Sequence, residues 1–204
     1  MSSSGHVVLV GMPGAGKSSV GRRLAKRLDR PFVDADDELV RRSGRSVRDW
    51  FATDGEPAFR AAESALLADL LAAPGASIVA AGGGAVLAEA NRALLRDGAT
   101  VVWLRAGVPY LLSRVLQKQD HRPLLDDDPE ARLTALHEAR TPLYEEVADI
   151  TIDVEPFRQA HDKPKRELAL RLAELLAPTP RPELGGKGDT GVADIPPSSG
   201  EEGA

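Results

Sequence analysis

Val7-Val8-Leu9-Val10 leads directly into Gly11-Met12-Pro13-Gly14-Ala15-Gly16-Lys17-Ser18, after which Val20, Leu24 and Leu28 recur at every fourth position. The order predicts a buried strand, a glycine-rich turn and an amphipathic helix. Glycines at this spacing let backbone N–H groups converge on phosphate oxygens at the start of a helix, where the helix dipole favours an anion. The stretch therefore predicts a phosphate-binding loop.

The end of this loop has the side chains of a nucleotide site. Lys17 can reach the outer phosphates of ATP, and Ser18 can offer its hydroxyl to Mg²⁺, the cofactor that we expect with the nucleotide. A chance glycine turn is the alternative, but both the spacing and the flanking elements favour the phosphate loop. The expected nucleotide contacts are Gly14, Ala15, Gly16, Lys17, Ser18 and Ser19.

Beyond the loop, short aliphatic runs alternate with helical patterns. This alternation is typical of an α/β fold, and it predicts a three-layer sandwich around a five-stranded parallel sheet. A last helical pattern runs through Leu168, Leu172, Leu175 and Leu176 and stops before Pro178. The predicted strands are residues 7–10, 31–34, 77–81, 100–104 and 149–154.

Composition excludes several classes of protein. With 26 Lys and Arg against 31 Asp and Glu the formal net charge is −5, which argues against a nucleic-acid partner. The absence of cysteine excludes disulfides, thiolate zinc sites and cysteine nucleophiles. No apolar run is long enough to cross a membrane, and residues 1–6 lack the pattern of a signal peptide, so we expect a cytoplasmic protein.

Three segments depart from simple alternation. Residues 36–72 are a helical stretch longer than a plain crossover, and residues 117–128 form a polar segment that reads as a mobile lid, with an ordinary surface loop as the alternative. Residues 178–204 hold five Pro, six Gly and a net charge of −3, so we expect a disordered acidic tail after a single domain of residues 1–177.

Two carboxylates follow the second predicted strand. Asp34 and Asp36 stand at i and i+2, and in an extended chain they would project to the same side, toward the phosphate crevice. Asp34 then suits Mg²⁺, and Asp36 can accept a hydrogen bond from a hydroxyl and act as base for an alcohol. The alternative is that Asp36 or Asp37 caps the helix that begins near Glu38.

An arginine and a glutamate follow on the next helix. Residues 53–56, Thr-Asp-Gly-Glu, have the form of a capping box, and Arg60 and Glu63 are then i, i+3 neighbours beside a buried stripe. An arginine held by a glutamate is preorganised to bind a second anion. A surface ion pair that contributes little is the competing interpretation.

A second cation and a glycine run belong to the same end of the predicted sheet. Gly82-Gly83-Gly84 ends the third strand, where it would let a substrate approach the backbone or serve as a hinge. Arg140 falls inside the apolar stripe of the helix opened by Asp128-Pro129, and an inward cation needs an anionic partner. Arg60 and Arg140 could clamp one substrate carboxylate, and an internal ion pair of Arg140 is the alternative.

The predicted lid is basic. It holds Lys118, His121 and Arg122, and an arginine there can cover the transferring phosphoryl group and stabilise its charge. We interpret His121 as a bystander. The histidines at positions 6, 121, 137 and 161 do not have the spacing of metal ligands.

Taken in order, these motifs and the segments Arg122-Pro123-Leu124-Leu125 and Arg140-Thr141-Pro142-Leu143-Tyr144 resemble the shikimate kinase family over about residues 7–177. The resemblance implies a P-loop kinase of the nucleoside-monophosphate-kinase type that transfers the γ-phosphoryl group of ATP to the 3-hydroxyl of shikimate. Its substrate-binding region would span about residues 36–63 and its lid about residues 115–128. A monomer is also what the family suggests.

The resemblance implies a role for each site residue. Lys17, Asp36 and Arg122 would be catalytic, and Ser18 with Asp34 would serve Mg²⁺. Asp36, Arg60, Gly83 and Arg140 would bind shikimate, and Arg114 and Arg122 would contact the nucleotide. The chain departs from the family after the last strand, at residues 153–158, which leaves open whether Arg158 or Pro156 meets the adenine.

Other functions fit parts of the pattern. A gluconate-type or nucleotide kinase would share the loop without needing Arg60 and Arg140, and a regulatory module could bind ATP without turnover. The basic run Arg22, Arg23, Lys26 and Arg27 could suggest RNA, but we interpret it as the solvated face of the first helix because apolar residues take the other side.

Overall fold

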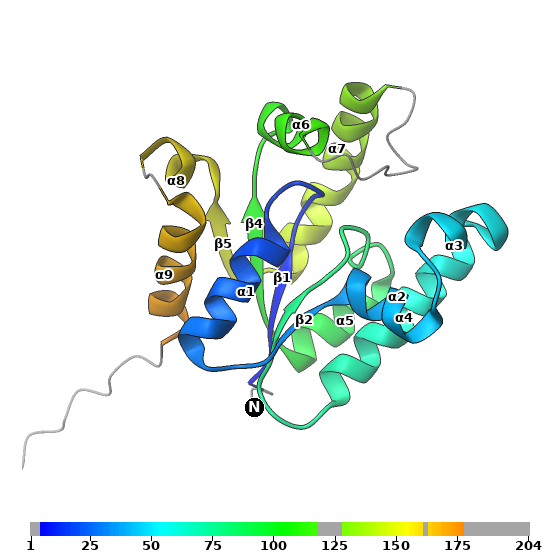
Figure 1. Ribbon diagram of the computed structural model, residues 1–204, viewed down its shortest axis with the longest axis horizontal. Helices are drawn as coiled ribbons and strands as arrows, with labels where there is room; N and C mark the ends of the chain where they lie inside the picture. Colours follow the sequence, from blue (N-terminus) through cyan, green and yellow to red (C-terminus); the bar gives the residue numbers. More distant parts are fainter. Residues whose placement is uncertain (1–4, 118–127, 161–162, 178–204) are drawn as a thin grey trace, which may run out of the picture.

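Five parallel strands form one sheet in the order β2-β3-β1-β4-β5 in the computed structural model, which describes residues 5–117, 128–160 and 163–177 (Figure 1). This confirms the predicted parallel sheet, and the observed strands differ from the predicted ranges by a residue or two at their ends. They are β1 Val7–Val10, β2 Phe32–Asp34, β3 Ile78–Ala80, β4 Thr100–Arg105 and β5 Ile150–Asp153.

Strand β1 lies at the centre of the sheet. Val7 pairs with Ile78 of β3 on one side and with Thr100 of β4 on the other. All four residues of β1 are buried, as expected for a strand covered on both faces of a parallel sheet. The phosphate loop therefore emerges from the middle of the sheet, at its carboxyl edge.

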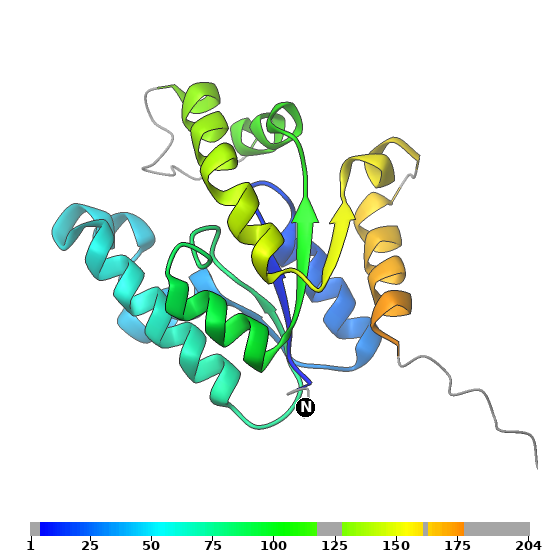
Figure 2. The same ribbon diagram turned by 180° about the vertical axis from the view of Figure 1, so that it is seen from behind.

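Helices cover both faces, which confirms the three-layer arrangement. On one face α1 (Lys17–Leu28) packs beside α9 (Pro164–Leu176) (Figure 1). On the other lie α4 (Gly55–Ala72), α5 (Glu89–Gly98) and α7 (Pro129–Val147) (Figure 2). The short α8 (Glu155–Ala160) contacts α9, and α6 (Val108–Leu116) lies beyond the carboxyl end of β4 and packs on α7.

The helical stretch 36–72 is not one helix. It divides into α2 (Ala35–Ser43), α3 (Val47–Thr53) and α4, because Gly44 ends α2 with a left-handed φ of 68° and Gly55 has a φ of 79°. Helices α2, α3 and α4 are held together by a small apolar cluster that includes Leu39 and Phe59.

The predicted capping box at residues 53–56 is wrong. Thr53 is the last residue of α3, and its hydroxyl donates to the carbonyl of Asp49 in the preceding turn, so it does not cap α4. The capping box instead joins Ser46 and Asp49, whose side chains each bond the backbone N–H of the other at 3.0–3.1 Å. Residues 46–49 and residues 53–56 each offer a hydroxyl followed three residues later by a carboxylate. Which of the two pairs forms a capping box depends on where the helix begins.

In the described part of the chain, no helix combines the length and apolar character that a bilayer crossing requires.

Candidate active site

The glycine loop is shaped by backbone conformations that only glycine adopts readily. Gly11, Gly14 and Gly16 have φ values of 137°, 91° and 100°. Gly16 immediately precedes α1, so the loop leads directly into the amino-terminal end of that helix, where unpaired backbone N–H groups favour an anion. The Nζ of Lys17 donates to the carbonyl oxygens of Gly11 at 2.7 Å and Met12 at 3.2 Å, which draws the lysine over the loop.

A cavity of about 80 Å³ opens directly above this loop. Residues from the ends of β1, β2 and β3 and from α6 line it, although they are far apart in the sequence. The predicted site residues that the structure brings together here are Gly14, Gly16, Lys17, Ser18, Ser19, Asp34, Asp36, Gly83 and Arg114.

Asp34 and Asp36 both line this cavity, but the geometry differs from the predicted extended pair. Helix α2 begins at Ala35, so Asp36 stands in its first turn and is exposed. Asp34, rather than Asp36 or Asp37, is the N-cap, and its Oδ1 accepts from the backbone N–H of Asp36 at 3.2 Å. The cap fixes Asp34 and places Asp36 one residue into the helix.

Arg60 on α4 is held by two carboxylates, as the i, i+3 spacing predicted for one of them. Its Nη1 donates to Glu63 at 2.8 Å, and its Nε and Nη2 donate to Glu56 at 3.1 and 3.0 Å. Glu63 is buried, which excludes the interpretation of this pair as an exposed surface contact. Burial alone would lower the pKa of Arg60, but Glu63 and Glu56 outweigh it and raise that pKa.

Glu63 is the buried anion of the site. Burial raises the pKa of its carboxyl, and the charges of Arg60 and Arg140 oppose that rise while Asp36 adds to it. Arg60 lies one turn before Glu63 on α4, whereas Asp36 lies on α2 and Arg140 on α7. Glu63 therefore interacts electrostatically with groups on all three helices. Its hydrogen bond to Arg60 holds that guanidinium beside Gly84, the residue after the cavity-lining Gly83.

The three glycines after β3 accommodate charged side chains of the protein itself. A Cβ on Gly82 would lie 2.1 Å from Oε1 of Glu63, and one on Gly84 would lie 2.2 Å from Nη1 of Arg60. A Cβ on Gly83 would lie 3.6 Å from Nη1 of Arg140. The groups that come close to this turn are thus side chains of the protein itself. The approach of a substrate to the same backbone stays a prediction.

Arg140 points inward from α7, as its place in the apolar stripe predicted, and only 3% of its surface is exposed. Its Nη1 donates to the carbonyl of Gly83 at 2.9 Å, and the hydroxyl of Tyr144 donates to the same oxygen at 2.6 Å. The ion pairs found among the described residues do not include Arg140, so the alternative of an internal salt bridge is not supported. Its buried Nε has no hydrogen-bond partner within the described residues.

Tyr144, one turn after Arg140 on α7, also contacts the glycine turn through its hydroxyl. Burial raises its pKa to about 12, with Arg140 acting in the opposite direction, so it stays a proton donor at neutral pH. Two donors on one carbonyl fix the glycine turn against α7. The helical spacing of Tyr144 to Arg140, i and i+4, was the signal that could have linked them.

A second cavity, of about 100 Å³, adjoins the loop on the side of α8 and α9. Ala15 and Arg114 line it, and so does Arg158, whose guanidinium lies 5.7 Å from the ring centre of Tyr110. Pro156 is not among its lining residues. Of the two adenine candidates, Arg158 is the one that borders this space.

Lys165 on α9 was missed by the sequence analysis. Its Nζ donates to the hydroxyl of Ser19 at 3.3 Å, and it lines both cavities beside the loop. Nothing in the local sequence distinguishes it from its basic neighbours Lys163 and Arg166. Only the packing of α9 against α1 brings it to the nucleotide loop.

Several predictions fall outside the described residues. Arg122 and the other basic residues of the predicted lid, Lys118 and His121, belong to segment 118–127, and the predicted tail is segment 178–204. The described part of the segment predicted to be a lid consists of the end of α6 and the cap of α7, where Asp128 accepts from the N–H of Ala131 at 3.0 Å.

The donors for a metal ion are an alcohol and a carboxylate. Ser18 and Asp34 line the same cavity as Lys17, and both offer the oxygen atoms that Mg²⁺ prefers. Within the described ranges there is no group of three or more His, Cys, Asp or Glu side chains that could hold a metal by themselves. This donor set fits Mg²⁺, which binds through one or two protein groups together with phosphate oxygens and water.

A parallel sheet with β1 at its centre, a glycine loop that opens α1 and a cavity lined by Lys17, Ser18 and Asp34 define a P-loop kinase. The family model for shikimate kinase matches residues 13–176. The chain belongs to the shikimate kinase family.

Individual relatives agree with this assignment. The shikimate kinase of Pseudomonas entomophila is 43% identical over 176 residues, which cover 86% of this chain and 98% of that protein. That of Ruegeria pomeroyi is 49% identical over 148 residues, 72% of this chain and 74% of that protein. A solved structure of the shikimate kinase from Acinetobacter baumannii in complex with shikimate has a TM-score of 0.76 and 37% identity, covering 83% of this chain and 91% of that one.

Proposed function

We propose that this protein is a shikimate kinase, which transfers the γ-phosphoryl group of ATP to the 3-hydroxyl of shikimate and releases shikimate 3-phosphate and ADP. Its place would then be in chorismate and aromatic amino-acid biosynthesis. Support comes from family membership over nearly the whole of the kinase region and from the similarity to a structure that contains shikimate.

The observation that carries the proposal is the convergence of two guanidinium groups on one glycine turn. Arg60 from α4 approaches Gly84, and Arg140 from α7 approaches Gly83, which lines the phosphate cavity. A carboxylate there can accept hydrogen bonds from both arginines.

On the nucleotide side, Gly14, Ala15, Gly16, Lys17, Ser18 and Ser19 would cradle the phosphates of ATP. Arg114 would contact the nucleotide, since it borders both loop cavities. Ser18 and Asp34 would hold Mg²⁺, which supplies positive charge to the phosphate oxygens. Lys17 would exchange its bonds to the loop carbonyls for bonds to phosphate oxygens.

On the acceptor side, Asp36 would accept a hydrogen bond from the 3-hydroxyl of shikimate and take its proton as the new bond to phosphorus forms. Its place in the first turn of α2, across the cavity from the loop, supports this role. Arg122 would come from the lid to the γ-phosphoryl group. Catalysis of this kind is mainly positioning and electrostatic stabilisation.

The remaining assignments are also proposals. We propose that residues 1–177 act as one kinase domain, with a substrate-binding region at about residues 36–63 and a lid at about residues 115–128, and that residues 178–204 are an acidic extension. We propose a monomer that works in the cytoplasm on small molecules, without a nucleic-acid or membrane partner.

A coupled assay of ADP release tests the proposal. The wild-type protein should release ADP with shikimate and not with gluconate or nucleoside monophosphates, whereas a regulatory module would show no acceptor-dependent release with any of them. Release with gluconate or with a nucleoside monophosphate in place of shikimate would contradict the proposal.

Two variants test the roles of residues. Arg60→Ala should raise the KM for shikimate by about tenfold or more, as expected for a lost charge-assisted bond, and leave the KM for ATP nearly unchanged. Asp36→Asn should lower kcat by a factor of about 10² or more. Arg41→Ala on the exposed face of α2 is a matched control that should change neither kcat nor the KM for shikimate. Equal losses for both substrates in Arg60→Ala would argue against the clamp.

A further inference from the structure

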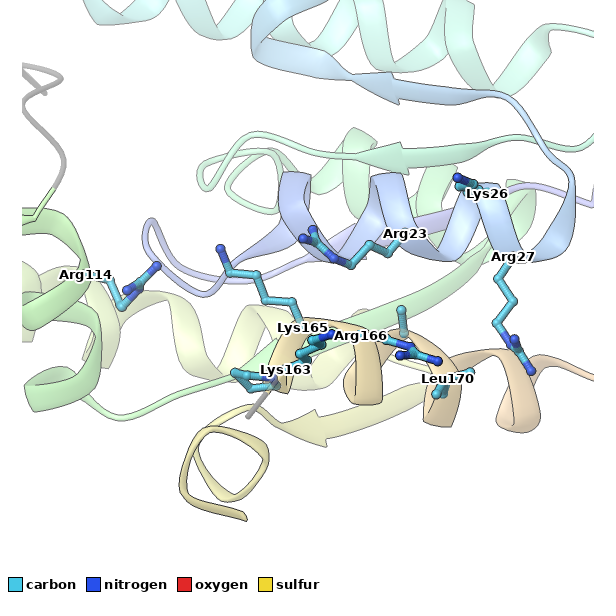
Figure 3. Close-up of a pocket in the computed structure, with 10 residues that line it drawn as sticks. Arg23, Lys26, Arg27, Arg114, Lys163, Lys165, Arg166 and Leu170 are labelled. Carbon is cyan, nitrogen blue, oxygen red and sulfur yellow. The ribbon is translucent and has the colours of Figure 1, made fainter. Parts of the chain in front are cut away.

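A long basic groove lies between α1 and α9, outside the site described above. It is lined by side chains of both helices and has a volume of about 940 Å³, larger than either loop cavity. Figure 3 shows Arg23 and Arg27 of α1 and Lys165 and Arg166 of α9 around the space between the two helices. Its seven basic lining residues are Arg23, Lys26, Arg27, Arg114, Lys163, Lys165 and Arg166.

The charges described along the groove are all of one sign. None of the described residues that line it is acidic, and Arg23, Lys26 and Arg27 are exposed. Elsewhere on the described surface, arginines are commonly paired with carboxylates, as Arg41 and Arg42 are with Glu38. A row of cations across a cavity repels itself and favours an anionic occupant.

The chain carries a segment of the opposite charge directly after α9. Residues 178–204 have a net charge of −3, and this segment begins two residues beyond Leu176, at the end of one wall of the groove. The acidic residues of the segment are Glu183, Asp189, Asp194, Glu201 and Glu202.

The segment is long enough to return along the groove. From Lys165 to Leu176, α9 rises by about 17 Å at 1.5 Å per residue. The seven residues from Leu176 to Glu183 can span about 24 Å when extended, and each later acid has a longer reach. Because the tail is tethered beside the groove, its effective concentration there is far above that of a free anion.

We propose that the acidic segment 178–204 of this chain docks in the basic groove between α1 and α9. The contact would be an electrostatic one, made by carboxylates of the tail on Lys26, Arg27, Lys163 and Arg166. It would also come close to the nucleotide loop, because Arg114 and Lys165 line both the groove and the loop cavities. The proposal stands on charge and tether length and does not depend on which acceptor the kinase uses.

The absence of cysteine makes a direct test possible. A Thr190→Cys variant of the full chain carries one thiol, and a nitroxide attached to it broadens the NMR signals of nearby amides. We expect the amide signals of residues 23–27 and 163–170 to lose at least half of their intensity. Those of α5, on the opposite face of the sheet, should keep theirs (Figure 2).

Charge variants supply the control. Lys26→Gln, Arg27→Gln and Arg166→Gln, combined in the labelled chain, should abolish the loss of intensity, as should about 0.5 M salt, because screening weakens exposed charges. The control is the triple variant Arg41→Gln, Arg48→Gln and Arg96→Gln, which removes the same amount of charge from α2, α3 and α5. In this variant the loss of signal intensity at the groove should persist. Amide spectra of each variant without the label verify that the fold is preserved.

Three results would overturn the proposal. The first is equal broadening on both faces of the sheet, and the second is broadening at the groove that persists in its triple variant. The third is broadening in a mixture of nitroxide-labelled chains with separate ¹⁵N-labelled chains, which would assign the groove to the tail of a second copy.

Discussion

At the scale of single residues, the glycines after β3 lack side chains of their own, and charged side chains from other parts of the protein fill the space beside them. Gly82 and Gly84 leave room for Glu63 and Arg60, and the carbonyl of Gly83 receives Arg140 and Tyr144. In the Arg60–Glu63 ion pair only Glu63 is buried, since Arg60 keeps part of its side chain exposed. A substitution in this turn therefore acts on the arginines before it acts on the fold.

Gly84→Ala tests this reasoning. Its Cβ would lie 2.2 Å from Nη1 of Arg60, the far end of a flexible side chain, so the guanidinium moves aside and the backbone does not. We expect the KM for shikimate to rise about tenfold or more, comparable with Arg60→Ala. The thermal midpoint and the KM for ATP should change little.

Gly98→Ala is the matched control, because its Cβ would meet Leu71 at 3.6 Å, an ordinary contact, on the far side of α5 from the site. It should leave both KM values unchanged. If Gly84→Ala bound shikimate as well as the wild type does, Arg60 would not need the position it occupies in this structure.

At this scale the sequence predicted what is local. The Arg60–Glu63 pair follows from i, i+3 spacing, and the inward direction of Arg140 follows from its helical stripe. The bond from Lys165 to Ser19 and the approach of Arg60 to Gly84 join distant segments, and no local pattern encodes them. The predicted geometry of Asp36 was also wrong. An extended chain would carry Asp34 and Asp36 on one side, but α2 begins at Ala35 with Asp34 as its N-cap, so Asp36 is already helical.

At the scale of elements, helix α2 is stabilised by charge at both ends. Asp34 caps it, Asp36, Asp37 and Glu38 lie in its first turn, and Arg41 and Arg42 lie in its last turn. Glu38 bonds both arginines at 2.7–2.8 Å, and those side-chain hydrogen bonds lower its pKa from 4.5 to about 2. Only 18% of the Glu38 side chain is exposed, whereas 71% of Arg41 is.

The lowered pKa gives a pH-dependent prediction for Glu38→Gln. Because the folded-state pKa lies below the unfolded value, the charge of Glu38 stabilises the fold fully above pH 4.5, and this is lost as the pH falls toward 2. We expect Glu38→Gln to lower the free energy of unfolding by about 1 kcal/mol at pH 7, a surface-pair magnitude reduced by solvent screening.

Urea unfolding of both proteins at pH 7, 5, 4 and 3 is the measurement. The difference in the free energy of unfolding between wild type and variant should be constant from pH 7 to 5 and should become smaller at pH 4 and 3. A difference that stays the same at pH 3 would show that the ionised carboxylate is not its source.

Helix α1 is seated against the sheet at a glycine. A Cβ on Gly21 would lie 2.5 Å from Cε2 of Phe32 on β2 and 3.1 Å from Leu9 on β1. Alanine normally stabilises a helix interior by up to about 1 kcal/mol relative to glycine. Here we expect Gly21→Ala to lower the free energy of unfolding by about 1–3 kcal/mol, because overpacking of the core outweighs helix propensity.

Urea unfolding also checks this sign, and Phe32→Val provides the control. If the clash with the ring is the cause, the double variant Gly21→Ala with Phe32→Val should lose less stability than the sum of the two single changes. A more stable Gly21→Ala protein would mean that α1 can move away from β2 without cost.

The helices also show where periodicity alone is insufficient. The strands were predicted to within a residue or two, and clear apolar patterns predicted α1, α7 and α9, with a stop signal after α9 at Pro178. Within the stretch 36–72, the capping-box pattern at residues 53–56 predicted a helix start close to that of α4, although the cap itself was wrong. The break between α2 and α3 was not predicted, because it depends on a left-handed glycine at Gly44, which a periodic pattern does not register.

At the scale of the whole molecule, net charge is a poor guide to where ligands bind. The chain is acidic, yet its cavities are lined by Lys17, Arg114, Arg158 and Lys165, and the charged residues described along the groove between α1 and α9 are all basic. The solvated face of α1 was predicted correctly as exposed. That α9 would present a second basic face to it could not be predicted, because the packing of two helices on one face of a sheet is a property of the fold.

The order of the strands also has a consequence for synthesis of the chain. Strand β1 is made first, is wholly apolar, and finds both of its partners, Ile78 and Thr100, only after most of the kinase region has been translated. Until then its edges and faces are open to other chains, a state prone to aggregation. The glycine loop is thus translated before the strands that hold β1 in place, so a growing chain has no formed loop cavity that a ligand could stabilise.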